Sequence, residues 1–350
     1  MSRKLPALLA LSAAVSLVLA GCSGAADSAS TATASAAPAS GDAAVTADSS
    51  ATTPATRASS VTIEDNHGSV EIALPVQRAA ATDNRTFEVL AQWGVPLVAA
   101  PKRIMPSTVT AYNGDDVADL GNHREPDLEA LVAAAPDLVI VGQRFAGHYD
   151  SIAQLTPEAA LLDLDPRDGQ PFDAELKRQV TALGQVFGKE AEAEQLIADF
   201  DAAVDRAKKA YDGSSKVMAV IVSGGEIGYS GPTTGRTWGP VFDLLGLKPA
   251  LEVQASTDDH QGDDVSVEQI AESNPDWIFV MDRDAAISAD DPSYTPAADV
   301  IAGNAALQNV TAVNSKQIVY APADTYTNES IITYTEILNS IADAFEGAKN

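Results

Sequence analysis

The chain has 350 residues and a formal net charge of −27, from 49 acidic and 22 basic residues. So acidic a protein is not expected to bind nucleic acid, and any basic cluster on it must be local. Its single cysteine is Cys22, close to the start of the sequence. The rest of the chain therefore has no disulfide, no thiolate metal site and no catalytic cysteine.

Residues 1–21 have the pattern of a secretory signal peptide. Arg3 and Lys4 precede an apolar run over residues 5–19, which is too short to cross ~30 Å of hydrocarbon. The sequence Leu19-Ala20-Gly21-Cys22 resembles the bacterial lipobox, in which the signal is removed in front of a lipid-modified cysteine. We expect Cys22 to anchor the protein to the extracytoplasmic face of the cell membrane. The alternative is a signal that is not cleaved or not modified.

Residues 22–60 are predicted to form a flexible, lipid-anchored tether. The segment consists mainly of Ala, Ser, Thr and Asp, and it lacks the large apolar side chains that would offset the entropy cost of ordering. An O-glycosylated stalk has the same composition, so the sequence leaves both readings open.

From residue 61 to the end, the pattern predicts an α/β fold with two lobes and mostly parallel sheets. Continuous apolar runs are typical of strands buried on both faces, and they alternate with helical patterns. We expect an N-terminal lobe over 61–171, a long connecting helix over 172–212 and a C-terminal lobe over 213–350. The clearest strands are 138–141, 217–222 and 278–281, and the clearest helices are 87–93, 128–134 and 267–272.

An internal repeat relates the two lobes. Residues 127–144 read DLEALVAAAPDLVIVGQR, and residues 266–283 read SVEQIAESNPDWIFVMDR. The two align without a gap, and each predicts a helix that ends before Pro-Asp and leads into a buried strand with an arginine just beyond it. Open α/β sheets bind ligands at the carboxyl ends of their strands. Arg144 and Arg283 are therefore expected to face one cleft.

Over about residues 61–350 the chain resembles the helical-backbone class of periplasmic binding proteins, which take iron-siderophores, haem or cobalamin. Within this class it is most similar to the catecholate-siderophore binders of the enterobactin and petrobactin type. The resemblance rests on Glu125–Glu129, on the two repeat units, and on Gly235-Arg236 ahead of Asp243–Gly246. It implies a monomer that captures a ferric siderophore and delivers it to an ABC import permease with its ATPase. The Fe³⁺ chelate is then the cargo, and the protein has no cofactor of its own.

The resemblance also implies a set of ligand-binding residues. Arg144, Arg236 and Arg283 match positions where catecholate-binding relatives place arginines, and forked guanidinium donors suit an anionic chelate. Arg124 falls where some relatives have a Lys or Arg that reaches the ligand. Trp238, next to Arg236, is expected to form an aromatic wall for ligand rings, with a buried loop anchor as the alternative.

Two further residues match the His and Tyr with which some relatives complete the coordination of ferric iron. These are His260 and Tyr326, and both side-chain types suit this metal. The surrounding sequence departs from the family pattern, because Gln261 follows His260 and the tyrosine loop lacks aromatic neighbours. These departures put the position of both loops in doubt.

The repeat glutamates, Glu129 and Glu268, match the carboxylates that relatives use to dock onto arginines of the permease. Acidic residues in a first helical turn also stabilise the helix N-terminus, so this plainer role remains open.

Other functions fit the sequence less well. A binder of the same fold could take a hydroxamate siderophore, haem or cobalamin, because cargo can change without a change of fold. A free-metal binding protein would have to use His67, His123, His148 and His260, which show no metal-binding spacing. No enzyme is expected, since residues 228–232 fail the nucleophile-elbow pattern at Pro232 and the chain has no P-loop or dinucleotide fingerprint.

Overall fold

The structure is a computed structural model and describes residues 59–349. The predicted signal peptide, Cys22 and the tether up to residue 58 lie outside this range. The described chain begins with a small antiparallel hairpin of β1 (Ser60–Glu64) and β2 (Ser69–Ala73).

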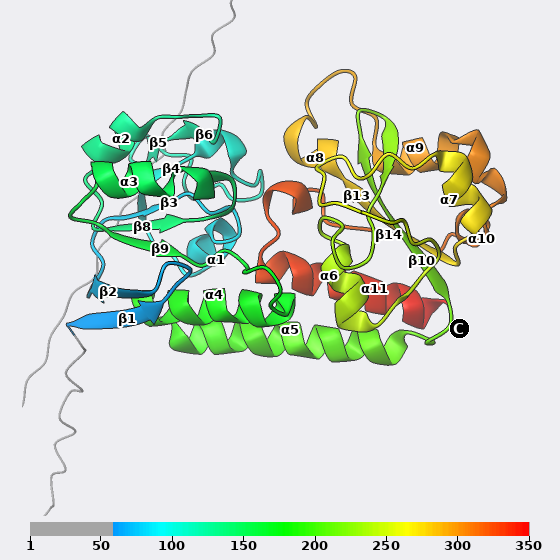
Figure 1. Cartoon of the computed structure of the whole chain (residues 1–350), viewed down its shortest axis with the longest axis horizontal. Helices are drawn as coiled ribbons and strands as arrows, with labels where there is room; N and C mark the ends of the chain where they lie inside the picture. Colours follow the sequence, from blue (N-terminus) through cyan, green and yellow to red (C-terminus); the bar gives the residue numbers. More distant parts are fainter. Residues whose placement is uncertain (1–58, 350) are drawn as a thin grey trace, which may run out of the picture. The chain divides into compact units, whose positions relative to one another are not determined.

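Five parallel strands form the sheet of the N-terminal lobe (Figure 1). β8 and β9 have apolar runs that are buried on both faces, as expected for a parallel sheet covered by helices. A second small hairpin, β6 (Gly121–Asn122) with β7 (Glu125–Pro126), follows the edge strand. In sheet order the five strands are β5 (Ala118–Asp119), β4 (Leu97–Ala100), β3 (Ala79–Ala81), β8 (Leu138–Val141) and β9 (Ala160–Asp163).

The sheet of the C-terminal lobe is mixed, with one antiparallel edge. β10 pairs in parallel with β13 and with β12, β13 pairs in parallel with β14, and only β11 runs antiparallel. The two-lobed α/β fold with mostly parallel sheets is thereby confirmed. The strands are β10 (Lys216–Ser223), β11 (Glu226–Tyr229), β12 (Lys248–Pro249), β13 (Trp277–Asp282) and β14 (Ile318–Tyr320).

Short helices connect the strands of each lobe, and three longer helices pack together along both (Figure 1). The short ones are α1 (Phe87–Gln92), α2 (Leu128–Ala133), α3 (Tyr149–Leu155), α6 (Gly239–Leu245), α7 (Val267–Ser273), α8 (Arg283–Ile287), α9 (Ala297–Gly303) and α10 (Thr311–Asn314). The longer ones are α4 (Phe172–Phe187), α5 (Glu190–Ala210) and α11 (Ile331–Gly347). Four 3₁₀ turns complete the described chain: η1 (Lys102–Ile104), η2 (Gln143–His148), η3 (Ala305–Asn309) and η4 (Thr325–Thr327).

The segment expected to form one connecting helix is in fact two helices that pack against each other. α4 ends at Phe187, and the next residue, Gly188, has a positive φ of 63°, the left-handed conformation that favours glycine after a helix C-terminus. Gly184 lets the helices approach closely, since a Cβ there would lie 2.9 Å from that of Ala193. α5 is the long backbone helix, and it packs against both α4 and α11.

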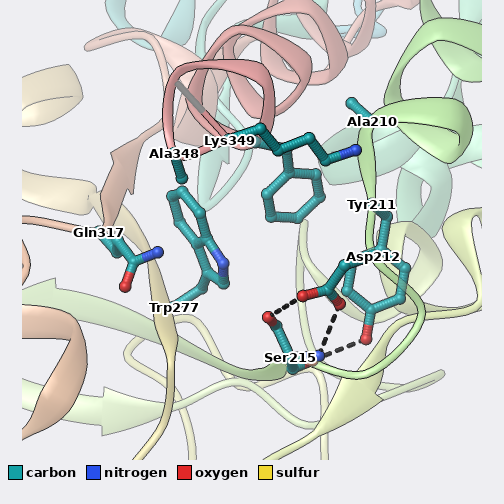
Figure 2. A pocket seen from close by; sticks show the side chains of 9 residues that line it. Ala210, Tyr211, Asp212, Ser215, Trp277, Gln317, Ala348 and Lys349 are labelled. Atoms are coloured by element: carbon teal, nitrogen blue, oxygen red, sulfur yellow. Dashed lines mark hydrogen bonds between the residues drawn. The ribbon is translucent and has the colours of Figure 1, made fainter.

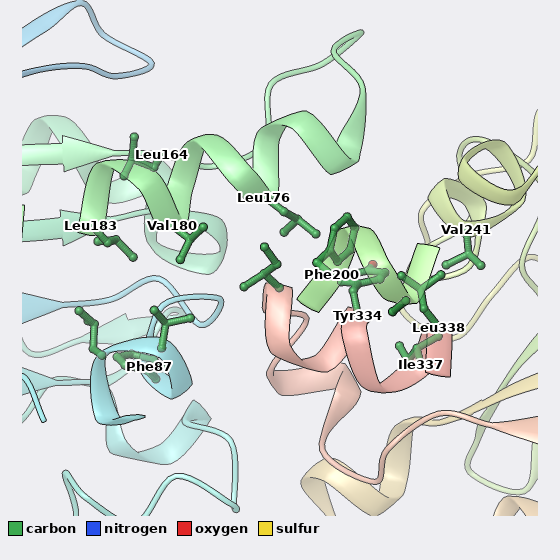
Figure 3. Packing of buried hydrophobic residues seen from close by; sticks show 14 of the residues in the cluster. Phe87, Leu164, Leu176, Val180, Leu183, Phe200, Val241, Tyr334, Ile337 and Leu338 are labelled. Atoms are coloured by element: carbon green, nitrogen blue, oxygen red, sulfur yellow. The ribbon is translucent and has the colours of Figure 1, made fainter. Parts of the chain in front are cut away.

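One apolar core joins the two sheets to the long helices, as Figure 3 shows for residues of α4, α5 and α11. Successive residues of β10 alternate between this core and a second one on the other face of the sheet. Val217, Ala219 and Ile221 belong to the shared core, whereas Met218 and its alternate neighbours belong to the second. Burial on both faces explains why this strand is apolar throughout.

Candidate ligand-binding site

Both repeat arginines lie directly beyond the carboxyl ends of central strands, as the sequence predicted. β8 ends at Val141 and Arg144 lies in the 3₁₀ turn that follows, while Arg283 is the first residue after β13. The side chain of Asp282 accepts a hydrogen bond from the backbone N–H of Ala285 at 3.0 Å and so caps the short helix that begins with Arg283.

Three arginines surround one tyrosine ring. The Cζ atoms of Arg144, Arg236 and Arg283 lie 4.8, 4.7 and 4.8 Å from the ring centroid of Tyr326. Arg144 and Arg236 also donate hydrogen bonds to the Tyr326 carbonyl oxygen, at 3.1 and 3.4 Å. Tyr326 is 3% exposed and lies in the loop between β14 and α11. The structure thus brings residues of both lobes into one cluster, which we call the arginine–tyrosine cluster.

The arginines change the acidity of the enclosed phenol. Burial by itself raises the pKa of Tyr326, but hydrogen bonds and charge from Arg144, together with Arg283 and Arg236, hold it below the ordinary value. A phenol that ionises more readily is a better oxygen ligand for a hard cation such as Fe³⁺.

His260 lies at the edge of the cluster. Its ring packs edge-on against Tyr326 with centroids 6.1 Å apart, and its Nδ1 is 3.2 Å from a guanidinium nitrogen of Arg236. Burial, followed by the charges of Arg236 and Arg144, lowers the pKa of His260. Because a guanidinium can only donate, Nδ1 accepts this bond and Nε2 carries the proton of the neutral ring. Coordination of iron by His260 would therefore require the Arg236 contact to be exchanged.

The structure favours one of the two predicted roles of Trp238. Its side chain is 0% exposed and its ring packs on Phe279 with centroids 5.3 Å apart. Its full burial favours the second alternative, a buried anchor of the loop that carries Arg236, over an aromatic wall for ligand rings.

Arg124 lies beside the cluster rather than in it. It is exposed, in the turn between β6 and β7, where its backbone N–H bonds to the side chain of Asn122. Burial and the charges of Arg144 and Arg124 lower the pKa of His123 in the same turn, so both arginines lie near this histidine.

Glu129 and Glu268 occupy equivalent exposed positions, in the first turns of α2 and α7. Neither caps its helix, since Asp127 and Ser266 accept the N-terminal hydrogen bonds from Ala130 and Gln269. Within residues 59–349, neither glutamate forms an ion pair, so both carboxylates are open to a partner.

Two residues of the site, Glu329 and Arg85, were not expected from the sequence. The carboxylate of Glu329 accepts a hydrogen bond from Arg236 at 2.6 Å, and Arg85 lies 3.9 Å from the same oxygen. Glu329 precedes a helix, where an acidic residue is ordinary, and nothing local sets it apart.

A polar cavity of about 410 Å³ adjoins Arg283 at the carboxyl ends of β10 and β13. A smaller pocket of about 130 Å³, shown in Figure 2, lies at the opposite edge of the same sheet. Ser215, Trp277 and Gln317 of this pocket are at the amino ends of β10, β13 and β14. Ligands of open α/β sheets bind at the carboxyl edge, so the arginine–tyrosine cluster is the candidate site.

The chain is similar to known binding proteins over most of its length. Its sequence is 29% identical over 293 residues to the ferric-anguibactin-binding protein FatB of Vibrio anguillarum, covering 82% of this chain and 88% of that protein. It is 26% identical to the petrobactin-binding protein YclQ of Bacillus subtilis, covering 77% and 83%. The crystal structure of the periplasmic catecholate-siderophore binding protein VctP from Vibrio cholerae matches the fold with a TM-score of 0.70 at 22% identity, over 82% of this chain and 99% of that one.

A family model described as periplasmic binding protein matches residues 80–325. This range covers more than half of the chain and includes the three arginines of the cluster, and it ends one residue before Tyr326. The protein therefore belongs to the periplasmic binding protein family.

Proposed function

We propose that this protein binds a ferric siderophore, of catecholate type, between its lobes and delivers it to an ABC import permease. The observation that carries the proposal is the set of three guanidiniums from both lobes around Tyr326. The names of the relatives FatB and YclQ, which bind ferric-anguibactin and petrobactin, support an iron chelate as the cargo.

The chemistry of the cluster favours an anionic chelate. Arg144, Arg236 and Arg283 offer planar, permanently charged donors that match the oxygens of catecholate rings, and guanidiniums also stack on aromatic faces. The protein as a whole is strongly acidic. A local cluster of three arginines in such a protein is therefore a distinct feature, and it is suited to an anionic ligand.

Tyr326 and His260 are proposed to complete the coordination of iron when the siderophore leaves positions open. The lowered pKa of Tyr326 supports a phenolate ligand. In residues 59–349, no group of three or more His, Cys, Asp or Glu side chains is placed to hold a metal ion. The proposed cargo is therefore the chelate rather than the bare ion.

Delivery is proposed to use Glu129 and Glu268 as contacts to the permease, with the protein acting as a monomer held at the extracytoplasmic membrane face by a lipid on Cys22. Both carboxylates are exposed at corresponding places in the two lobes, which supports the docking role. Of the helices described, none is long and apolar enough to span a bilayer.

Titration of the intrinsic fluorescence of Trp93, Trp238 and Trp277 tests the cargo. A bound ferric catecholate absorbs light and should quench this emission in a saturable way, although all three side chains are buried. The panel contains a ferric tris-catecholate, a ferric bis-catecholate, ferrioxamine, haem and cobalamin. Saturable quenching by ferrioxamine, haem or cobalamin without a response to either catecholate would contradict the proposal.

A further inference from the structure

The loop that carries Tyr326 is bonded to both lobes. It spans residues 321–330, continuing from β14 of the C-terminal sheet into α11. Asn84 of the N-terminal lobe donates to the Thr327 carbonyl at 2.7 Å. Glu88 of α1 accepts hydrogen bonds from Asn328 and Ser330 at 2.9 and 2.7 Å. The position of this loop therefore fixes the two lobes relative to the site.

Glu329 is the buried acidic residue of this loop. It is 2% exposed, and its backbone has a positive φ of 51°, an uncommon conformation for a residue with a side chain. Its carboxylate accepts hydrogen bonds from Arg236 and Thr237 at 2.6 Å each, and from Gln143 of the N-terminal lobe at 3.2 Å. One carboxylate thus holds the loop of Arg236 and the turn next to Arg144.

Glu329 also supplies negative charge to a site built to be positive. Burial raises its pKa, but the charges of Arg236 and Arg85 and the hydrogen bond from Thr237 outweigh burial and hold the pKa below the ordinary value. The group is therefore ionised at neutral pH. Arg236 is the charge that affects Glu329 most, ahead of Arg85, which also pairs with Asp165 at 2.8 Å, so the charge of Glu329 acts on the arginine–tyrosine cluster as well as on Arg85.

A buried carboxylate is a costly way to fix an arginine, because both charges lose their hydration. A neutral acceptor such as Gln could bond to Arg236 and Thr237 without weakening the attraction for an anion. The presence of a full charge therefore reduces the net positive charge that a ligand meets.

We propose that Glu329 is a positioning residue that fixes Arg236 and at the same time sets the charge preference of the site. By partly compensating the three guanidiniums, it favours chelates of moderate negative charge over the most highly charged ones. The inference rests on the proposed function, since it names which anionic iron chelates the site prefers.

The test compares two ferric complexes of different charge, a tris-catecholate and the less negatively charged bis-catecholate, by fluorescence titration. In Glu329→Gln, the site gains one positive charge at a nearly unchanged shape. The ratio of the two affinities should shift toward the tris-catecholate by roughly three- to tenfold per unit of charge difference, given a partly screened interaction over several ångströms. An unchanged ratio would overturn the inference.

Glu88→Gln is the matched control, because Glu88 bonds to the same loop but does not touch an arginine of the cluster. If loosening of the loop is the only effect, each variant lowers its affinities for the two complexes by the same factor, and the ratio of the affinities stays that of the wild type. Under the proposal, the ratio shifts in Glu329→Gln alone, and an equal shift in Glu88→Gln would refute it.

Glu329→Asp separates position from charge and also covers the case in which the Gln variant fails to fold. The shorter side chain keeps the charge but cannot hold Arg236 and Gln143 together. Both affinities should fall by about tenfold or more while their ratio stays that of the wild type. Unchanged affinities would contradict the positioning role. A wild-type protein that binds neither complex would instead refute the proposed function.

Discussion

Arg144 is the arginine of the cluster whose replacement should cost the most ligand affinity. All three guanidiniums lie at nearly the same distance from the Tyr326 ring, so position alone does not rank them. The three arginines differ in the carboxylates that pair with them. Arg236 pairs with Glu329 at 2.6 Å and Arg283 with Asp284 at 3.4 Å, whereas Arg144 has no ion-pair partner among the described residues.

The size of the effect follows from the distances. A ligand charge about 5 Å from a guanidinium interacts with it by about 0.8 kcal/mol at the dielectric constant of water and about 3 kcal/mol at an effective value of 20. For a partly buried site, a loss of about 2 kcal/mol is expected for Arg144→Ala, or roughly thirtyfold in Kd. The free energy of unfolding should change by less than about 1 kcal/mol. Relief of repulsion between the arginines offsets the lost contact with the Tyr326 ring and the hydrogen bond to its carbonyl.

Fluorescence titration with the ferric catecholates and urea denaturation measure the two quantities on the same variants. Arg124→Ala is the comparison, because the resemblance predicts that Arg124 reaches the ligand, whereas the structure places it in the exposed turn between β6 and β7, outside the cluster. It should weaken binding by no more than about threefold. A larger loss in Arg124→Ala than in Arg144→Ala would refute the reasoning, as would a smaller loss in Arg144→Ala than in Arg283→Ala.

Three further predictions concern other parts of the protein. Tyr326→Phe keeps the ring but removes the phenol oxygen. It should lower the affinity for the ferric bis-catecholate at least about tenfold more than that for the tris-catecholate, whose iron needs no further ligand. Equal losses would exclude Tyr326 as an iron ligand. The double variant Glu129→Gln and Glu268→Gln should leave the Kd for the ligand within about twofold of the wild type yet impair iron uptake in cells. Both side chains are exposed and lie on α2 and α7 rather than in the cluster. Weaker ligand binding in vitro would contradict a role of these glutamates in docking alone. Burial and the charge of Asp165 raise the pKa of Asp83 from 3.8 to about 7. The folded state then binds more protons than the unfolded state between these values, so the free energy of unfolding should fall as pH rises from about 4 to about 7. The decrease is on the order of 2–4 kcal/mol across this pH range, and Asp83→Asn should remove most of it. If urea denaturation gives both proteins the same pH dependence of the unfolding free energy, Asp83 is not its cause.

Several features of the fold were predictable because they depend on neighbours in the sequence. The repeat over 127–144 and 266–283 gave two helices, two buried strands and an arginine beyond each strand, and the structure has all of them. These features follow from apolar periodicity and from the helix-stopping effect of Pro-Asp. The break at Gly188 was harder to predict, because Gly184 and Gly188 permit a turn without requiring one. Packing of α5 against α4 decides that the chain turns there.

The site was predictable only in part. Arg144, Arg236, Arg283 and Tyr326 were expected from the resemblance, and the structure brings them together. For Trp238 the sequence left an aromatic wall and a buried anchor open, and its full burial favours the anchor. The sequence gives no sign of which side chains of an irregular loop turn inward.

The two-lobed α/β fold and the arginines at the strand ends could be predicted from the sequence, because periodicity and strand polarity are local properties. The carboxylates that balance those charges become visible only in the folded chain. Arg236 meets Glu329 across 93 residues, and Asn84 meets Thr327 across 243. Such pairs form when the chain has already folded, so no pattern of neighbouring residues marks them. The carboxylate of Glu329, which restrains the arginines, is therefore a property of the fold rather than of any motif.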